Sequence, residues 1–218
     1  PLPAVDRAEL GAERFAERLR LNGSEPLVPQ LLTCAYQPTE NSGDVTRSAA
    51  ATVAKALGAR YHVMNVQPML VAYRAAIEEA LGRELTWERD DITLQNLQAR
   101  VRSPSIWALA NEHNSILMAT SNRSEAAVGY TTMDGDSSGG LAPISGVDKS
   151  FVLAWLRWLE ATGPGGVGPF PEMSVITAQQ PTAELRPKSA SQRDEDDLMP
   201  YAVLDAIEEL YIRDRLAP

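Results

Sequence analysis

The chain has 218 residues, of which 44% are hydrophobic, so it is long enough for one domain with an apolar core. Its formal net charge of −9 at pH 7 argues against general binding to nucleic-acid phosphates, which require a basic surface. A single cysteine, Cys34, excludes an internal disulfide, and no apolar run approaches the ~18 residues of a membrane helix. These features predict a cytoplasmic protein whose partners include neither nucleic acid nor a membrane.

Helical and strand patterns alternate along the chain. Apolar residues recur at helical spacing in the longer segments, whereas the shorter apolar runs are typical of buried strands. In chain order, the patterns predict a helix at 6–21 within an N-terminal helical extension (1–29), a strand at 30–36, a helix at 44–57, a strand at 60–66, helices at 68–81 and 91–111 with a break near Pro104, a strand at 115–120, and helices at 121–128, 148–161 and from about 201 to 215.

This alternation predicts an α/β fold with a doubly wound, Rossmann-like parallel sheet flanked by helices. Ligands bind such sheets beyond the carboxyl ends of the strands, which places residues 33–37, Gln67 and residues 120–125 on one functional edge. Residues 163–199 form a long loop region, and loops of that length are usually functional or disordered. We expect residues 1–218 to form a single, partial domain.

The first polar segment that can carry chemistry is the predicted helix around Asn96 and Arg100. These two residues are four apart and so share one helix face, whereas Arg102 is expected to point elsewhere. A guanidinium can hold a carboxylate or phosphate through two parallel hydrogen bonds. The alternative is a solvated face with ion pairs, which the spacing alone slightly favours.

The second segment runs from the apolar strand at 115–120 into a short helix. Thr120 ends the strand, and Glu125 lies about one turn inside the helix. A carboxylate at this position can help to hold Mg²⁺, which takes one or two carboxylates together with phosphate oxygens. The alternative is an ordinary helix cap with a favourable acidic residue in its first turn. The residues alone do not separate these two interpretations.

The third segment combines the small-residue loop at 134–143 with Lys149 and residues 180–185. Lys149 opens a helix, where the helix dipole disfavours a cation. A lysine in this position indicates a task such as neutralising phosphates. The alternative is that its side chain reaches into solvent.

Together these segments resemble the NAD⁺ synthetase family, and the pattern is closest to its long, glutamine-dependent members. Eight stretches with the family's order and spacing carry the resemblance over residues 30–213. They are NLQAR (96–100), TSNRSE (120–125), GYTT (129–132), GD (135–136), LAPI (141–144), DK (148–149), PTAEL (181–185) and DEDDLMPY (194–201).

The resemblance implies a fold of the adenine nucleotide alpha hydrolase-like, ATP pyrophosphatase type, and a ligase that converts deamido-NAD⁺ to NAD⁺ through an acyl-adenylate, with ATP and Mg²⁺. It further implies a homodimer, for which the final helix and the helix with Trp155 and Trp158 are candidate surfaces. The implied ligands of deamido-NAD⁺ are Arg100, Asn96, Asp136 and Gly140; those of ATP are Thr120, Lys149 and Thr182; Glu125 would bind the metal.

The chain also departs from the family pattern. The pyrophosphate-binding loop S-G-G-x-D-S does not occur in it, so we expect the sheet to be incomplete at its N-terminal strand, with that loop just upstream of Pro1. Ammonia would come from glutamine hydrolysis in a separate upstream amidase domain. We therefore expect the isolated chain to have little synthetase activity. Two alternatives remain: another amidating synthetase of the ATP pyrophosphatase type, and a non-catalytic, dimerising fragment.

Overall fold

The computed structural model describes residue 17 and residues 25–216. The helix expected at 6–21 lies almost entirely outside the described residues, and so does most of the expected N-terminal extension. The part that is described contains a short helix, α3 (Leu27–Leu31). The strand predicted from residue 30 therefore begins too early, because Gln30 and Leu31 belong to α3. Hydrophobicity alone cannot separate a short apolar helix from a strand.

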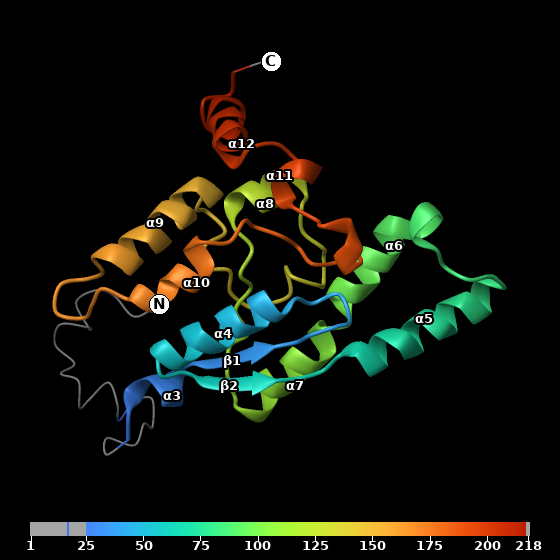
Figure 1. Cartoon of the computed structure of the whole chain (residues 1–218), viewed down its shortest axis with the longest axis horizontal. Coiled ribbons are helices and arrows are strands. Elements are labelled where there is room, and N and C mark those ends of the chain that lie inside the picture. Colours follow the sequence, from blue (N-terminus) through green and yellow to red (C-terminus); the bar gives the residue numbers. More distant parts are fainter. Residues whose placement is uncertain (1–16, 18–24, 217–218) are drawn as a thin grey trace.

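The described sheet consists of two parallel strands, β1 (Thr33–Tyr36) and β2 (Arg60–Val63). Thr33 pairs with Arg60 and Tyr36 with Val63. The connection between them contains helix α4 (Asp44–Ala56), which packs against both strands (Figure 1). The predicted α/β class with parallel strands is thus confirmed, although the sheet is small.

The third predicted strand, residues 115–120, does not form. Its only strand-like contact among the described residues is an isolated parallel bridge between Met118 and Leu141. Two hydrogen bonds join the segments, from Ala119 N to Leu141 O (2.8 Å) and from Gly140 N to Leu117 O (2.9 Å). Gly139 permits this approach, because a Cβ there would lie 2.6 Å from Ala119 N. The predicted strand is therefore reduced to a pairing at one residue, and its partner Leu141 belongs to a loop.

The middle of the chain is helical, and the break predicted near Pro104 is confirmed. Helix α6 ends at Arg100, and α7 begins at Ser103 with Pro104 in its first turn, where proline needs no hydrogen-bond donor. Gly82 ends α5 in the left-handed conformation at φ 64°, which glycine adopts without strain. The bounds are α5 (Gln67–Leu81), α6 (Trp87–Arg100), α7 (Ser103–Glu112), α8 (Arg123–Val128) and α9 (Lys149–Ala161).

Residues 163–199, predicted as a long loop, are irregular apart from short helical segments. A longer helix and a π-helical turn then end the described chain. The segments are η1 (Pro171–Met173), α10 (Ser174–Thr177), η2 (Lys188–Ala190), α11 (Asp194–Asp197), α12 (Tyr201–Glu208) and η3 (Glu209–Arg213). In residue 17 and residues 25–216, no helix combines the length and apolar character needed to cross a membrane.

Figure 1 shows how these elements surround the sheet. Helix α9 and the short η1 and α10 lie beyond α4, and both η1 and α10 contact α4. Helix α7 faces β1 across a largely apolar cavity of about 400 Å³, which Cys34 and His113 help to line. Trp155 and Trp158 on α9 are 45% and 43% exposed, so they are not core residues of the described chain.

A buried amide organises the carboxyl end of β1. Gln98 on α6 is 1% exposed, and its Oε1 accepts hydrogen bonds from Thr39 Oγ1 and Asn41 Nδ2, both at 2.9 Å. Its Nε2 donates to Leu185 O (2.9 Å) and Glu184 O (3.3 Å). One side chain therefore joins the loop after β1, the end of α6 and the segment at 184–185.

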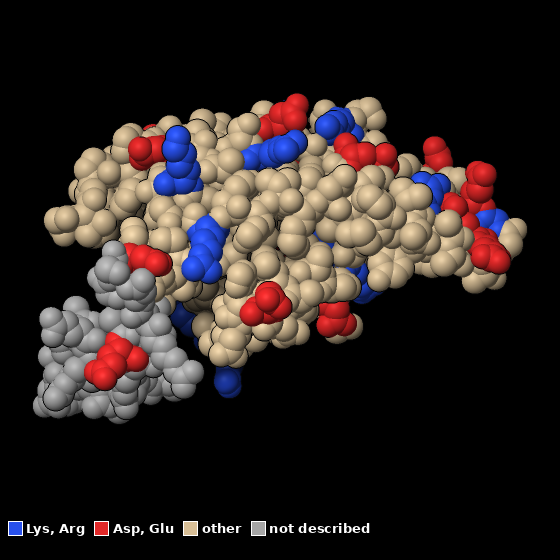
Figure 2. All heavy atoms as spheres, turned by 90° about the horizontal axis from the view of Figure 1, so that it is seen from below, with Lys and Arg blue, Asp and Glu red and all other residues tan. Residues whose placement is uncertain are grey.

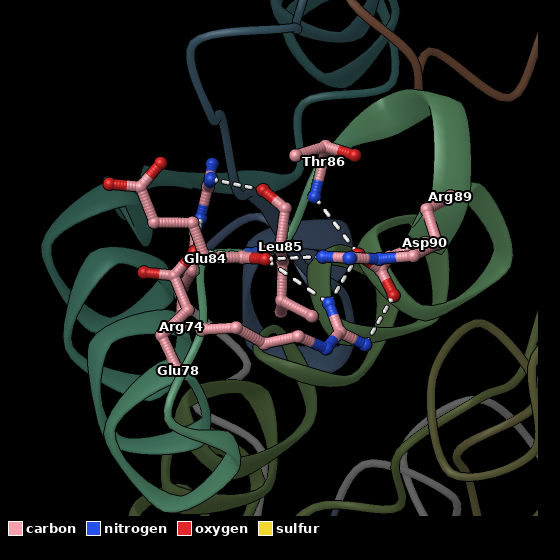
Figure 3. A network of polar contacts seen from close by, with 8 residues as sticks. Arg74, Glu78, Glu84, Leu85, Thr86, Arg89 and Asp90 are labelled. Carbon is pink, nitrogen blue, oxygen red and sulfur yellow. Dashed lines mark hydrogen bonds and ion pairs between the residues drawn. The ribbon is translucent and has the colours of Figure 1, made fainter.

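The turn between α5 and α6 is held by charged side chains (Figure 3). Both oxygens of Asp90 accept from the Arg83 guanidinium at 2.9 Å, and Asp90 also accepts from Thr86 N at 3.0 Å. The Arg83 guanidinium, with the Thr86 amide, keeps the pKa of Asp90 well below its ordinary value. Figure 2 shows charges of both signs gathered at this end of the molecule.

Replacement of Gln98 by leucine is expected to lower the free energy of unfolding by about 3 kcal/mol, because Thr39 and Asn41 lose their buried acceptor. Urea denaturation followed by circular dichroism measures the change. Gln180→Leu, at an exposed position, is the matched control and should have little effect. An equal loss in both variants would contradict the role of the amide.

Replacement of Asp90 by asparagine should destabilise the chain at neutral pH, with an effect that fades in acid. Since the folded-state pKa is depressed, the carboxylate contributes stability above its ordinary pKa of 3.8, and this contribution is lost as the pH falls below that value. Urea titrations of both proteins at about pH 7 and about pH 2 measure the difference. A difference that does not change with pH would assign the loss to packing.

Candidate functional site

Segments far apart in the sequence meet at a cavity of about 370 Å³, called here the Lys149 cavity. Five predicted site residues lie in its wall: Thr120, Glu125, Asp136, Lys149 and Thr182. Three other predicted residues, Asn96, Arg100 and Gly140, do not line it. The complete lining is Thr120, Ser121, Glu125, Tyr130, Asp136, Lys149, Pro181, Thr182, Ala183 and Asp194.

Glu125 occupies the cap of helix α8. The Asn122 side chain accepts from Glu125 N at 3.0 Å, and Glu125 Oε2 accepts from Asn122 N at 3.2 Å, so the two residues form a capping box. The helix cap that the sequence offered as the alternative role of Glu125 is therefore present. It uses only one carboxylate oxygen, which leaves Oε1 for a second contact in the cavity.

Lys149 makes that second contact. Its Nζ lies 2.9 Å from Glu125 Oε1, and each side chain is only 17% exposed. The ammonium also lies 5.4 Å from the centre of the Tyr201 ring, an arrangement that favours a cation. Lys149 follows the helix cap Asp148, whose side chain accepts from Phe151 N at 2.6 Å. The side chain thus turns into the protein, and the alternative that it reaches into solvent is wrong.

Two hydrogen bonds between tyrosine and aspartate side chains lie near this ion pair. Tyr201 Oη donates to Asp194 Oδ2 and Tyr130 Oη donates to Asp197 Oδ2, both at 2.9 Å. Burial, followed by the neighbouring carboxylates, raises the pKa of both phenols, so each remains a donor at neutral pH. Burial also raises the pKa of Asp194, whereas Tyr201 and then Lys149 oppose that shift.

The segment that carries Thr182 is fixed from both sides. Asp194 N donates to Pro181 O at 3.2 Å, which ties the start of α11 to the residue before Thr182. Two residues further on, Glu184 Oε2 accepts from Thr46 Oγ1 (2.8 Å) and Gly43 N (3.2 Å) at the start of α4. Glu184 has φ 49°, so these contacts hold it in an uncommon conformation.

Asn96 and Arg100 contact a loop of the cavity instead of the cavity itself. Thr132 Oγ1 donates to Asn96 Oδ1 at 2.8 Å, and Arg100 Nε donates to Met133 O at 3.0 Å. The same loop carries Asp136, whose oxygens accept from Thr132 N (2.6 Å) and Thr131 Oγ1 (3.0 Å). In the described chain the two residues therefore position the loop that presents Asp136.

Gly140 lies apart from this group. It is exposed and belongs to the segment that pairs with residues 117–119. A Cβ at Gly140 would make ordinary van der Waals contact with Ile116 Cγ2, at 3.8 Å. The structure therefore brings Gly140 to the end of the 115–120 segment and not to the Lys149 cavity.

Arg102 is a residue that the sequence interpretation missed. It helps to line an adjoining cavity of about 260 Å³, together with Gln37, Asp136 and Ala183. Its Nε donates to Gln37 O, and burial lowers the pKa of its guanidinium. The sequence predicts that Arg102 points away from the face of Arg100, and the two guanidinium groups do contact different segments: Arg100 donates to Met133 O and Arg102 to Gln37 O.

Known proteins are similar to this chain in sequence and in structure. Residues 27–217 match the model of a family described as NAD synthase. The chain belongs to the NAD synthase family. It is 36% identical over 183 residues to a glutamine-dependent NAD(+) synthetase of Aquifex aeolicus, and 37% identical over 177 residues to one of Rhodobacter capsulatus.

A solved structure of a glutamine-dependent NAD(+) synthetase is also similar to this chain. The glutamine-dependent NAD(+) synthetase from Cytophaga hutchinsonii is 45% identical and superposes with a TM-score of 0.70, over 86% of this chain and 28% of that one. The matches to the Aquifex and Rhodobacter proteins cover 84% and 80% of this chain, but only 30% and 31% of those proteins. This NAD synthase domain therefore spans about a third of the length of its relatives.

The Lys149–Glu125 pair should show a measurable coupling energy. In a double-mutant cycle with Lys149→Met and Glu125→Gln, we expect about 1–2 kcal/mol, since both groups are largely shielded from solvent. Glutamine can keep the capping box, so the cycle isolates the charge. The solvent-exposed Arg213–Asp214 pair, at 2.8 Å, is the control and should give a smaller coupling. Equal couplings would show that burial adds nothing to the Lys149 pair.

Proposed function

We propose that this chain provides the nucleotide-binding site of a ligase that converts deamido-NAD⁺ to NAD⁺ with ATP. The observation that carries the proposal is the convergence of Thr120, Glu125, Lys149 and Thr182 on one cavity, in a chain that belongs to the NAD synthase family. In the proposed reaction, the nicotinate carboxylate attacks the α-phosphorus of ATP and pyrophosphate leaves. Ammonia then attacks the acyl carbon, and AMP leaves.

Lys149 has the central role on the ATP side. Its ammonium is the only cationic side chain in the wall of the Lys149 cavity among the described residues. Placed against the phosphates, it would stabilise the negative charge that passes to pyrophosphate as the bond to the α-phosphorus breaks. The hydroxyls of Thr120 and Thr182 would donate to phosphate oxygens on either side. Positioning and charge neutralisation are sufficient for this chemistry, so no nucleophilic side chain is required.

The residues fit a magnesium ion. Glu125 and Asp194 provide carboxylate oxygens, and one oxygen of Asp194 is buried without a hydrogen-bond partner. The described residues contain no cluster of three or more histidine, cysteine, aspartate or glutamate side chains placed for a metal. Mg²⁺ takes one or two carboxylates and completes its shell with water and phosphate oxygens. When bound, Mg²⁺ would neutralise phosphate charge; Glu125 would hold it.

The dinucleotide would lie toward the loop at 131–136. Asp136 faces both the Lys149 cavity and the adjoining cavity, so a ligand that spans the two would pass it. Asn96 and Arg100 hold this loop through Thr132 and Met133, and Arg100 is exposed for a further contact. We assign the dinucleotide side to Asp136, Asn96 and Arg100. The assignment of Gly140 to the dinucleotide has less support, because Gly140 lies at the bridge with residues 117–119.

Ammonia would come from glutamine hydrolysed elsewhere in the complete protein. The relatives from Aquifex aeolicus and Rhodobacter capsulatus are named glutamine-dependent, and about two thirds of their length lies outside the match to this chain. We propose an amidase domain as the ammonia source and self-association into a homodimer as the assembly. The exposed Trp155 and Trp158 of α9 support the second proposal.

Substitution of the phosphate-facing residues should weaken nucleotide binding. We expect Lys149→Met to raise the Kd for ATP about ten-fold, because a charge-assisted contact is lost, and Thr182→Val to raise it less. Isothermal titration calorimetry with ATP and Mg²⁺ measures both. Lys188→Met removes the same charge from an exposed position on η2 and should leave the Kd unchanged.

Calorimetric titration with the substrates that are amidated distinguishes this reaction from those of related synthetases. The chain should bind deamido-NAD⁺ in preference to xanthylate or citrulline, the acceptors of other amidating synthetases. Binding is the measurement of choice because the chain spans about a third of its relatives' length. Preference for another acceptor, or equal weakening of ATP binding by Lys149→Met and Lys188→Met, would overturn the proposal.

A further inference from the structure

Asp194 has a buried oxygen without a partner. The residue begins α11 and is 5% exposed. Its Oδ2 accepts from Tyr201 Oη at 2.9 Å, whereas Oδ1 is buried and has no hydrogen-bond donor. A buried polar atom in this state costs free energy, so its retention calls for an explanation such as an ion that binds there.

The other carboxylates in the Lys149 cavity differ from Asp194 in this respect. Glu125 Oε1 pairs with Lys149 Nζ at 2.9 Å, and Glu125 Oε2 accepts from Asn122 N at 3.2 Å. Both oxygens of Asp136 accept from the 131–132 segment. Of the carboxylate oxygens in the described wall of this cavity, Asp194 Oδ1 alone is left without a donor.

The position of Asp194 suits a cation ligand for geometric reasons. It lies in the same cavity wall as Glu125, and its Oδ1 has no hydrogen-bond donor that a cation would have to displace. A cation that entered between the two carboxylates would remove their repulsion and satisfy the free oxygen at once. Monodentate carboxylates of this kind are the usual protein ligands of Mg²⁺.

We propose that Asp194 is a second carboxylate ligand of the divalent cation in this cavity, beside Glu125. The proposal rests on the proposed nucleotide site, since the phosphates of ATP would supply further oxygen ligands. It assigns a binding role to the DEDDLMPY segment, for which the family resemblance gave no residue role. Tyr201 is consistent with this role, because its hydroxyl donates to Oδ2 at 2.9 Å and leaves Oδ1 without a donor.

The test is a titration of the chain with Mn²⁺, followed by electron paramagnetic resonance, with and without a non-hydrolysable ATP analogue. We expect Asp194→Asn to weaken Mn²⁺ binding at least about ten-fold in the presence of the analogue. Binding of the analogue in EDTA should stay within about two-fold, because asparagine preserves the shape of the side chain. Asp196→Asn, at an exposed position on the same short helix and outside the cavity wall, is the matched control and should not alter Mn²⁺ binding.

A second variant gives a direct signature that does not depend on the first. Asp194→Cys, titrated with Cd²⁺ alone, should develop the ultraviolet charge-transfer band of a cadmium–thiolate bond. The unmodified chain, which retains Cys34, provides the background spectrum. A positioning role for Asp194 would not produce this band, since no bond to the metal is involved.

The outcomes separate the two proposals. Failure of the unmodified chain to bind the analogue in the presence of Mg²⁺ would count against the proposed nucleotide site, whereas Cd²⁺ binding to Asp194→Cys would still report on Asp194. Unchanged Mn²⁺ affinity in Asp194→Asn would overturn the assignment of Asp194. So would an equal loss of analogue binding with and without metal, or the absence of the cadmium band.

Discussion

The half-buried ion pair between Lys149 and Glu125 is the contact around which the candidate site is arranged. An ammonium at the start of a helix opposes the helix dipole, and shielding from solvent adds a desolvation cost. Glu125 compensates both, and it is held in turn by the capping box of α8. The site therefore depends on a short helix whose first turn is fixed before any ligand arrives.

The buried Gln98 network connects this site to the sheet. Gln98 holds the carbonyls of residues 184 and 185, and the same segment carries Thr182 into the Lys149 cavity. Thr39 and Asn41, which follow β1, contact the other end of the same amide. The position of the phosphate-facing threonine is thus set by the carboxyl end of β1. Ligand sites of parallel α/β proteins have this relation to their strands.

Much of the fold and site followed from sequence, and the failures have identifiable physical causes. Helix ends marked by Gly82 and Pro104 were predictable, because those residues have few conformational choices. Residues 115–120 were expected to pair as a strand, but pairing depends on a distant partner that local pattern does not specify. Arg102 was given no role, because its place in the adjoining cavity beside Gln37 and Asp136 depends on segments distant in the sequence. The unpaired oxygen of Asp194 exists only in three dimensions, so no sequence pattern could reveal it.

The charge balance of the Lys149 cavity limits what can bind there. Its wall contains three carboxylates, Glu125, Asp136 and Asp194, and a single ammonium, that of Lys149. A polyphosphate that entered alone would meet a net negative wall, and Lys149 is already paired. A nucleotide that arrives with a divalent cation reverses this balance, because the cation attracts the carboxylates and frees Lys149 for the phosphates. The excess of acid over base in the wall therefore favours nucleotide binding that is weak without a divalent cation and stronger with one.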